Sequence, residues 1–107
     1  MKRAWWLLPI ALFAFTTACA SRHGDDFAFA NRMVRAGLWK EAVYRYQKLL
    51  AGGQETAAIH NNLAIALEGL GRFEEADAEY LKALKLAPGD AGIKNNHEKL
   101  LTLRGDQ

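Results

Sequence analysis

Three histidines, a single cysteine and two adjacent glutamates are the side chains of this 107-residue chain best suited to catalysis or metal binding. His23, His60 and His97 each lack a cysteine or carboxylate at metal-ligand spacing on their own helical face. Glu68 follows His60 by about two helical turns, which is too far for both side chains to bind one metal ion. We therefore predict no metal, no cofactor and no role as a stand-alone enzyme.

The other reactive side chains have structural explanations. Glu74 and Glu75 stand where a helix is predicted to begin, and acidic residues there stabilise the positive end of the helix dipole. Cys19 has no base near it in the sequence, so it is a poor candidate for a nucleophile. The pair Gly52-Gly53 lacks the Lys-Ser or Lys-Thr that follows in a phosphate-binding loop. Function must therefore be sought in the elements that the rest of the chain builds.

Residues 1–18 have the composition of a secretory signal peptide. The segment from Trp5 to Phe15 contains no polar side chain, follows Lys2 and Arg3, and precedes small residues. This segment is too short to cross a bilayer comfortably, since a spanning helix needs about 20 apolar residues. An uncleaved anchor helix over residues 4–20 is the alternative.

The end of this segment, Thr-Thr-Ala-Cys at residues 16–19, resembles a bacterial lipobox, in which the cysteine is acylated and becomes the first mature residue. A lone cysteine cannot close an internal disulfide, which is compatible with that modification. The resemblance implies a small bacterial lipoprotein anchored at Cys19 by acyl chains such as palmitate. Because Ala20 rather than an aspartate follows, it also implies the outer membrane of the cell envelope, with the protein facing the periplasm. An ordinary cleaved signal peptide with an unused thiol is the alternative.

The charge of the chain does not favour a nucleic-acid partner. The formal net charge is +2, from 14 basic and 12 acidic residues. Cleavage before Cys19 would remove Lys2 and Arg3, so the basic count would fall from 14 to 12 and the mature chain would be close to neutral. Without a basic excess there is no general attraction to a phosphate backbone.

The sequence repeats itself with a period of about 34 residues. Shifting residues 23–56 onto residues 57–90 superimposes seven identical residues, most of them small, aromatic or turn-forming, which indicates matched packing rather than matched charge. The pair Asn61-Asn62 recurs at the same spacing as Asn95-Asn96. The seven identical pairs are Ala30 with Ala64, Gly37 with Gly71, Glu41 with Glu75, Ala42 with Ala76, Tyr46 with Tyr80, Lys48 with Lys82 and Leu50 with Leu84.

Residues 57–88 resemble a tetratricopeptide repeat, a helix–turn–helix unit of about 34 residues. The small, turn, aromatic and proline positions of its pattern hold Ala64, Gly71, Phe73, Ala76, Tyr80, Ala83 and Pro88. His60 replaces the tryptophan that is usual at its position. The first repeat, residues 23–56, is looser, with Leu49 and Gln54 where alanine and proline belong. It keeps Ala30, Gly37, Trp39, Ala42 and Tyr46.

Hydrophobic periodicity independently predicts the same hairpins. Apolar residues recur every three or four positions over Ile59–Leu70 and over Phe73–Ala87, which indicates two amphipathic helices. Gly71 between them can adopt the left-handed conformation that ends a helix, and so short a turn makes the helices antiparallel. The first hairpin is predicted to begin with Asp25 or Asp26 as its cap.

A fifth helix over Ala91–Leu103, with Asp90 as its cap, is predicted to close the array. His97 and Glu98 stand on it where a full repeat carries apolar and small residues. We therefore expect an all-α fold of two antiparallel helix–turn–helix repeats and a C-terminal capping helix. The expected organisation is a signal peptide (1–18), an acylated cysteine and tether (19–24), a helical domain (25–104) and a tail (105–107).

The resemblance also implies a binding surface. In tetratricopeptide proteins the first helices of successive repeats line a concave groove that holds an extended peptide or a partner helix. Side-chain amides in such a groove can donate and accept hydrogen bonds along a peptide backbone. Carried over by position, the groove here comprises Phe27, Asn31, Val34, Ala58, Asn61, Asn62, Ile65, Glu68, Asn95 and Lys99.

Two of these asparagines correspond to those of the carboxylate-clamp subfamily. Asn31 and Asn62 stand at the two asparagine positions of the clamp, but its basic positions are not basic here. This departure disfavours recognition of a C-terminal carboxylate. The basic positions hold Phe27, Gly92 and Asn96.

The function that we expect is a membrane-tethered scaffold that binds another protein in its groove. One alternative is a structural subunit, self-assembling or assembling with a different protein, of a pilus, secretion or cell-wall complex. Exposed apolar residues such as Val43 and Tyr44 would then support a homodimer. Another alternative is a periplasmic enzyme subunit whose catalytic residues lie on a different chain.

Overall fold

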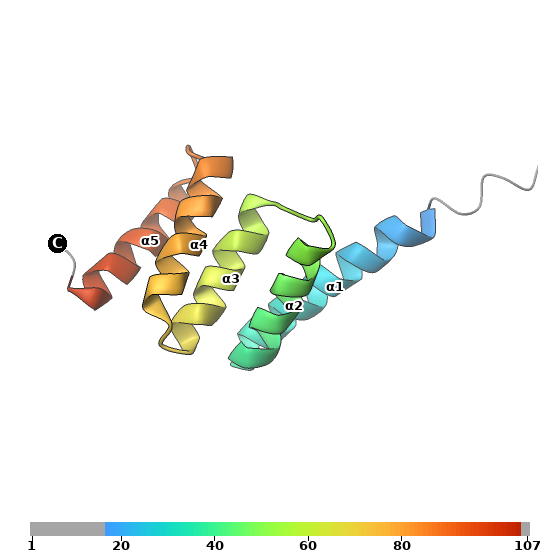
Figure 1. Cartoon of the computed structure of the whole chain (residues 1–107), viewed down its shortest axis with the longest axis horizontal. Helices are drawn as coiled ribbons and strands as arrows, with labels where there is room; N and C mark the ends of the chain where they lie inside the picture. Colours follow the sequence, from blue (N-terminus) through green and yellow to red (C-terminus); the bar gives the residue numbers. More distant parts are fainter. Residues whose placement is uncertain (1–16, 106–107) are drawn as a thin grey trace, which may run out of the picture.

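The computed structural model describes the backbone of residues 17–105 and the side chains of residues 24–105. The predicted signal-peptide segment from Trp5 to Phe15 and the side chain of Cys19 lie outside this description. The described residues form an all-α fold without strands, as the sequence predicts. Its helices follow one another as an array in which each packs against the next (Figure 1). They are α1 (Thr17–Arg35), α2 (Trp39–Ala51), α3 (Ala57–Gly69), α4 (Phe73–Leu86) and α5 (Ala91–Arg104).

The two hairpin turns have the same backbone geometry at equivalent positions of the repeats. Gly71 has φ +74°, and its N–H donates to the carbonyl oxygen of Glu68 at 2.9 Å. Gly37 has φ +71° and makes the equivalent bond to Val34 at 3.0 Å. A residue with a β-carbon is strained at such φ values, which explains the glycine at both positions. These turns fold α2 back on α1 and α4 back on α3.

Helix starts follow the sequence signals only in part. Asp90 Oδ1 accepts a hydrogen bond from the Ile93 N–H at 3.0 Å, which confirms Asp90 as the cap of α5. Thr56, which the sequence analysis did not single out, caps α3 in the same way. The predicted caps Asp25 and Asp26 are wrong, because α1 already begins at Thr17 and both residues lie inside it. Residues 17–24 contain no proline, the residue type that most strongly opposes a helix.

Small residues and tyrosines form the centre of the core. Ala30, Ala42, Ala64, Ala76, Ala83, Tyr46 and Tyr80 all have 0% of their surface exposed. The alanines permit close approach of neighbouring helices, and the tyrosine rings fill the space beside them. Pro88, by contrast, is exposed and lies just beyond the end of α4.

The prediction that Val43 is exposed is wrong, whereas Tyr44 is exposed as predicted. Val43 belongs to the core cluster. Because α2 packs against both α1 and α3, it buries a wider face than one hydrophobic stripe suggests.

An aromatic contact joins the two repeats. Trp39 begins α2 and is half-buried, and its indole lies against the backbone of α3 at Gly69. A β-carbon built on Gly69 would lie only 2.3 Å from Cδ2 of the Trp39 ring. The indole therefore occupies the space that a side chain at residue 69 would need.

The last helix is held by few apolar side chains and by a polar cluster. Only Ile93 and Leu100 of α5 are buried. Asp77 on α4 contacts His97 Nε2 at 2.5 Å and Arg104 Nη1 at 3.2 Å. Within residues 17–105, no helix combines the length and apolar character that crossing a membrane requires.

Candidate partner-binding groove

Four asparagines form a continuous row of hydrogen bonds across the first helices of the repeats. Asn96 of α5 donates from Nδ2 to Asn61 Oδ1 at 3.2 Å, and Asn61 of α3 donates to Asn62 Oδ1 at 3.0 Å. Asn62 in turn donates to Oδ1 of Asn31 on α1 at 2.8 Å. We call these four residues the amide row. It links α1, α3 and α5 on one face of the array.

A buried tyrosine fixes the α1 end of the amide row. The Tyr46 hydroxyl, carried by α2, donates to Asn31 Oδ1 at 2.5 Å. Burial raises the pKa of Tyr46 to about 12, against the opposing effects of the Asn62 amide and the charge of Arg35. The hydroxyl therefore stays protonated at neutral pH and remains a hydrogen-bond donor to Asn31.

The groove has a hollow beside this tyrosine. Its volume is about 250 Å³, and its lining residues are Asn31, Val34, Arg35, Tyr46 and Asn62. Three of these lining residues, Asn31, Val34 and Asn62, are half-buried, Tyr46 is fully buried, and Arg35 is exposed. The hollow thus combines amide groups, one apolar wall and one cation.

The other predicted groove residues differ in their surroundings. Phe27 is half-buried, with its ring centroid 6.2 Å from that of Tyr46, and Ile65 is also half-buried. Glu68 accepts a hydrogen bond from the Tyr80 hydroxyl at 2.6 Å, so this carboxylate is engaged within the fold. The exposed members are Ala58, Asn95 and Lys99.

Asn96 takes part in the amide row although it was not among the predicted groove residues. Its neighbour Asn95, which was predicted, makes no side-chain hydrogen bond within the described residues. Adjacent residues on a helix point about 100° apart, so a shift of one position decides which amide meets Asn61. The repeated Asn-Asn pairs, which stand at equivalent positions of successive repeats, are the sequence signal from which this contact could have been found.

His60 is buried and has two carboxylate partners that the sequence did not indicate. Only 3% of its surface is exposed, which agrees with its replacing a large packing residue. Its Nδ1 lies 2.5 Å from Glu79 Oε2 and its Nε2 lies 3.1 Å from Glu55 Oε1. Both carboxylates come from outside α3, so no spacing on that helix could indicate them. The arrangement joins α3, α4 and the loop before α3. Among residues 24–105, no cluster of histidine, cysteine and carboxylate side chains could hold a metal ion.

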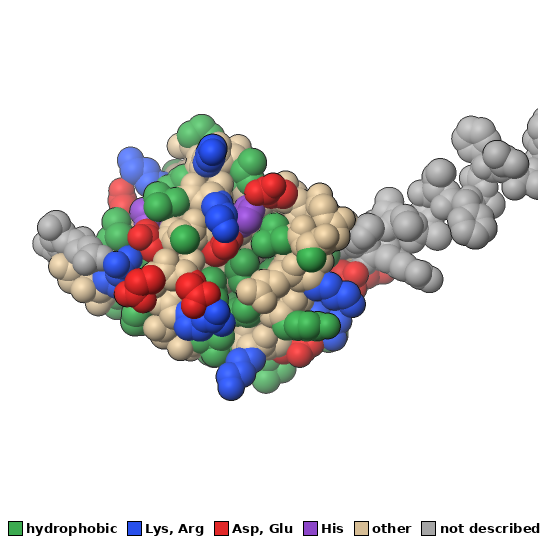
Figure 2. All heavy atoms as spheres, in the orientation of Figure 1, with side chains coloured by type: hydrophobic (Ala, Val, Ile, Leu, Met, Phe, Trp, Pro, Cys, Tyr) green, Lys and Arg blue, Asp and Glu red, His purple; other side chains and the backbone are tan. Residues whose placement is uncertain are grey.

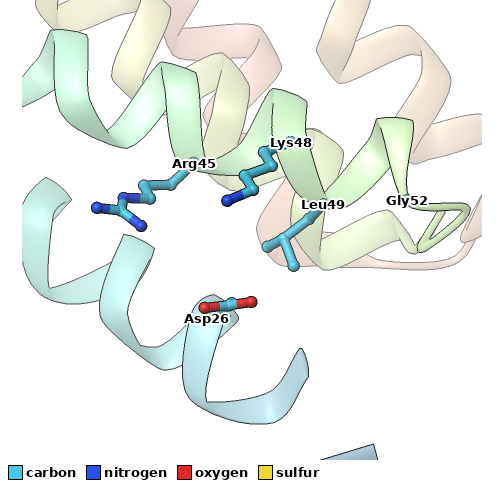
Figure 3. Close-up of a pocket in the computed structure, with 5 residues that line it drawn as sticks. All are labelled: Asp26, Arg45, Lys48, Leu49 and Gly52. Carbon is cyan, nitrogen blue, oxygen red and sulfur yellow. The ribbon is translucent and has the colours of Figure 1, made fainter. Parts of the chain in front are cut away.

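A second hollow lies between α1 and α2, away from the amide row. Figure 3 shows its lining residues, Asp26, Arg45, Lys48, Leu49 and Gly52, around a volume of about 170 Å³. Arg45 is already engaged, because its Nε donates to Glu41 at 2.7 Å and its guanidinium lies 4.8 Å from the Phe29 ring centroid. The lining residues include no serine, threonine, cysteine or histidine.

The surface charges of the described residues are mixed in sign on the face that Figure 2 shows. On the face shown in Figure 2, Lys and Arg side chains are interspersed with Asp and Glu side chains over α2, α3 and α4. A mixed surface of this kind does not have the single-sign potential that attracts nucleic acid.

Comparison with known proteins identifies the second hairpin. Residues 57–90 match the family model of the tetratricopeptide repeat. The chain is also similar to the TPR repeat-containing thioredoxin TTL4 of Arabidopsis thaliana, with 36% identity over 73 residues. The match covers 68% of this chain and 10% of the relative, so the chain spans about a tenth of that protein's length. The chain therefore contains a tetratricopeptide repeat in α3 and α4.

Proposed function

Because residues 57–90 form a tetratricopeptide repeat, a unit that generally binds other proteins, we propose that this chain is an adaptor that holds a segment of a partner protein in its groove. The amide row is the observation that carries this proposal. Four half-buried asparagines from three helices place side-chain amides side by side along one face of the array. Amides serve peptide binding because they bond to main-chain groups whatever the side chains of the partner.

A membrane tether is the second part of the proposal. Residues 16–19 resemble a lipobox, and residues 1–18 have the composition of a signal peptide. An acylated Cys19 would place the adaptor at a membrane, with the outer membrane facing the periplasm as the proposed location. A groove confined to a membrane surface raises the local concentration of its partner without new contacts.

The groove is tested by crosslinking capture from intact cells. The tagged full-length chain is crosslinked, purified and analysed by mass spectrometry beside the variants Asn62→Ala and Asn95→Ala. Asn62 stands in the middle of the amide row, whereas Asn95 is an exposed asparagine without a side-chain hydrogen bond among the described residues. We expect a partner that is lost with Asn62→Ala and retained with Asn95→Ala. Circular dichroism should show that both variants keep the helix content of the parent chain.

Equal recovery of the partner from all three chains would reject the groove as the binding surface. Loss of helix together with loss of the partner in Asn62→Ala would assign Asn62 to the fold instead. The substitution Asn31→Asp then probes the groove from its α1 side, since it keeps an oxygen that can accept from Tyr46 and Asn62, replaces the Nδ2 donor with a second oxygen and adds a negative charge.

The tether is tested by the substitution Cys19→Ser. We expect the variant to leave the membrane fraction and to lose incorporation of an alkyne-labelled palmitate, because serine hydroxyl does not replace the acylated thiol. Retention of Cys19→Ser in the membrane fraction would favour the anchor helix over residues 4–20.

Surface apolar residues favour assembly as a second candidate function. Five large apolar side chains in the described part of the chain are at least half exposed, namely Leu38, Tyr44, Leu81, Leu86 and Leu103. Such residues can serve contacts between copies or with another subunit of an envelope complex. Sedimentation of the detergent-solubilised chain tests this, and a monomer at micromolar concentration would count against self-assembly.

A further inference from the structure

The first hairpin has one side that no described helix covers. Along the array each hairpin packs against the next, and α5 lies beyond α4 at the far end. On α2, Arg45 and Lys48 stand about 120° and about 180° around the helix axis from Trp39, which contacts α3 at Gly69. These two cationic residues therefore lie on the side of α2 away from α3. We call this side of α1 and α2 the outer face of the first hairpin.

Unpaired charges of both signs line the hollow on the outer face (Figure 3). Asp26 of α1 and Lys48 of α2 are exposed, and neither side chain forms a hydrogen bond or ion pair among the described residues. Because both residues line one hollow between antiparallel helices, they lie at the same level along the hairpin. The outer face thus carries one carboxylate and one ammonium group that are still available to a partner.

A second pair of charges stands one helical turn from the centre of the outer face. Arg32 and Arg45 lie 5.3 Å and 4.8 Å from the ring centroid of Phe29, so residues 29 and 45 are level with each other. Arg32 follows Phe29 by one turn, and Glu41 precedes Arg45 by one turn, both toward the hairpin turn. Toward that turn, α1 therefore carries a negative and then a positive charge, whereas α2 carries a positive and then a negative one.

This order of charges is complementary to itself under a two-fold rotation. An axis parallel to the helices places α1 of one copy opposite α2 of a second copy and leaves every residue at its own level. Asp26 of each copy then faces Lys48 of the other, and Arg32 faces Glu41. A two-fold axis across the helices would place α1 against α1, and this match would be lost.

We propose that the outer face of the first hairpin binds a second copy of this chain about such an axis. Repeat arrays normally need about three repeats and a polar cap at each end. With α5 at one end of each copy, the pair would form a continuous stack with a capping helix at both ends. The two α1 helices would be parallel, so both residue-19 ends would point the same way, as attachment to one membrane requires.

The inference rests on the second candidate function, self-assembly, and it names the surface that would serve it. The surface uses none of the residues assigned to the groove, so each copy in the pair would keep its own groove. The pairing of the two copies can therefore be tested separately from the binding of a partner protein.

Reciprocal charge reversal tests the pairing in full-length chains. Chains with two different tags are mixed in neutral detergent micelles and captured by one tag, and recovery of the other tag measures association. Asp26→Lys or Lys48→Asp places like charges opposite each other when a variant pairs with itself. In a mixture of these two variants, each reversed residue faces an opposite charge. We therefore expect each variant to lose association with itself and the mixture to regain it.

The expected size of the effect follows from the exposure of these charges. Each single reversal replaces two exposed ion pairs by two repulsions, so association should weaken roughly tenfold, and less at high salt. The control Lys94→Asp reverses an exposed charge on α5, at the other end of the array, and should associate like the parent chain. Circular dichroism should show the helix content of the parent chain in every variant, because only exposed side chains are changed.

A parent chain that stays monomeric, undiminished self-association of either variant, or a mixture that does not regain association would overturn the inference. Association regained only when both reversals are in one chain would show that Asp26 and Lys48 pair within one molecule, which also refutes it. A different protein that both reversals lose would assign the outer face to that protein instead. The groove function is read separately, because a monomeric chain whose captured partner depends on Asn62 would leave the adaptor standing and refute the pair.

Discussion

The contact between Trp39 and Gly69 predicts that a glycine-to-alanine change inside a helix will destabilise this protein. In most helices Gly→Ala is favourable by up to about 1 kcal/mol, because alanine loses less conformational entropy. At Gly69 the added methyl group would lie 2.3, 2.5 and 2.7 Å from three ring atoms of Trp39. Carbon atoms normally approach to about 3.5–4.0 Å, so the indole has to move by more than about 1 Å.

The expected size of the effect follows from these opposing contributions. Overpacking of a formed contact costs about 1–3 kcal/mol. The higher helix preference of alanine stabilises the folded state by at most about 1 kcal/mol, and by less at Gly69 because this is the last residue of α3. We therefore expect Gly69→Ala to lower the free energy of unfolding by about 1–2 kcal/mol. In a domain of this size, about 1 kcal/mol corresponds to about 4–8 °C in Tm.

Thermal unfolding followed by circular dichroism in the far ultraviolet measures this effect, and two further chains isolate its cause. Gly24→Ala is the matched control, because Gly24 lies inside α1 and a β-carbon there meets nothing within 4 Å. That variant should be as stable as the parent chain or more so. In a Trp39→Leu background the cost of Gly69→Ala should largely disappear, as a double-mutant cycle would register. If Gly69→Ala raises Tm as Gly24→Ala does, the indole does not lie against α3 and the reasoning is refuted.

Three further changes test the cap, the buried phenols and the close helix contact. Asp90→Ala removes the acceptor of the Ile93 N–H and should cost about 1 kcal/mol in urea unfolding, whereas Asp90→Asn should retain most of the stability. Burial raises the pKa of Tyr46 and of Tyr80 above that of a free phenol, so the folded state binds these protons more tightly than the unfolded chain. Their contribution should be fully present below about pH 10 and lost as pH rises through about 10–12, and a flat profile of urea midpoint against pH over that range would contradict it. Ala76→Trp should abolish cooperative unfolding, since Ala76 is completely buried, and an unchanged melting curve would exclude a close contact there.

The hairpins could be predicted from the sequence because their determinants are local. Ala42 and Ala76 are fully buried, and Gly71 has the left-handed backbone that ends a helix. Size, spacing and turn chemistry within a single repeat specify each of these features. The repeat itself made the prediction stronger, because the same residue types recur at equivalent positions of the first hairpin.

The contacts between different helices could not be predicted from the sequence, because they depend on how the helices pack. Trp39 meets Gly69, and His60 meets Glu79, across sequence separations that no periodic pattern relates. Only part of the amide row could be predicted from the sequence. Asn31 and Asn62 were expected in the groove, but the hydrogen bond between them depends on how α1 and α3 pack. Composition within a helix shows which face is polar, whereas the partner of each polar group is decided by the neighbouring helix.

The unbroken course of α1 affects how a protein attached at residue 19 would be held. A helix rises about 1.5 Å per residue, so about 18 Å of continuous helix, rather than a flexible linker, separates residue 19 from Asn31. A flexible linker lets a binding site sample many orientations, whereas a rigid helix fixes both the distance and the tilt of the site relative to its attachment point. Gly24 has the weakest helix preference in this part of α1, and it is therefore where the helix would bend. The angle between α1 and the membrane at residue 19 would then determine which partners can approach the groove.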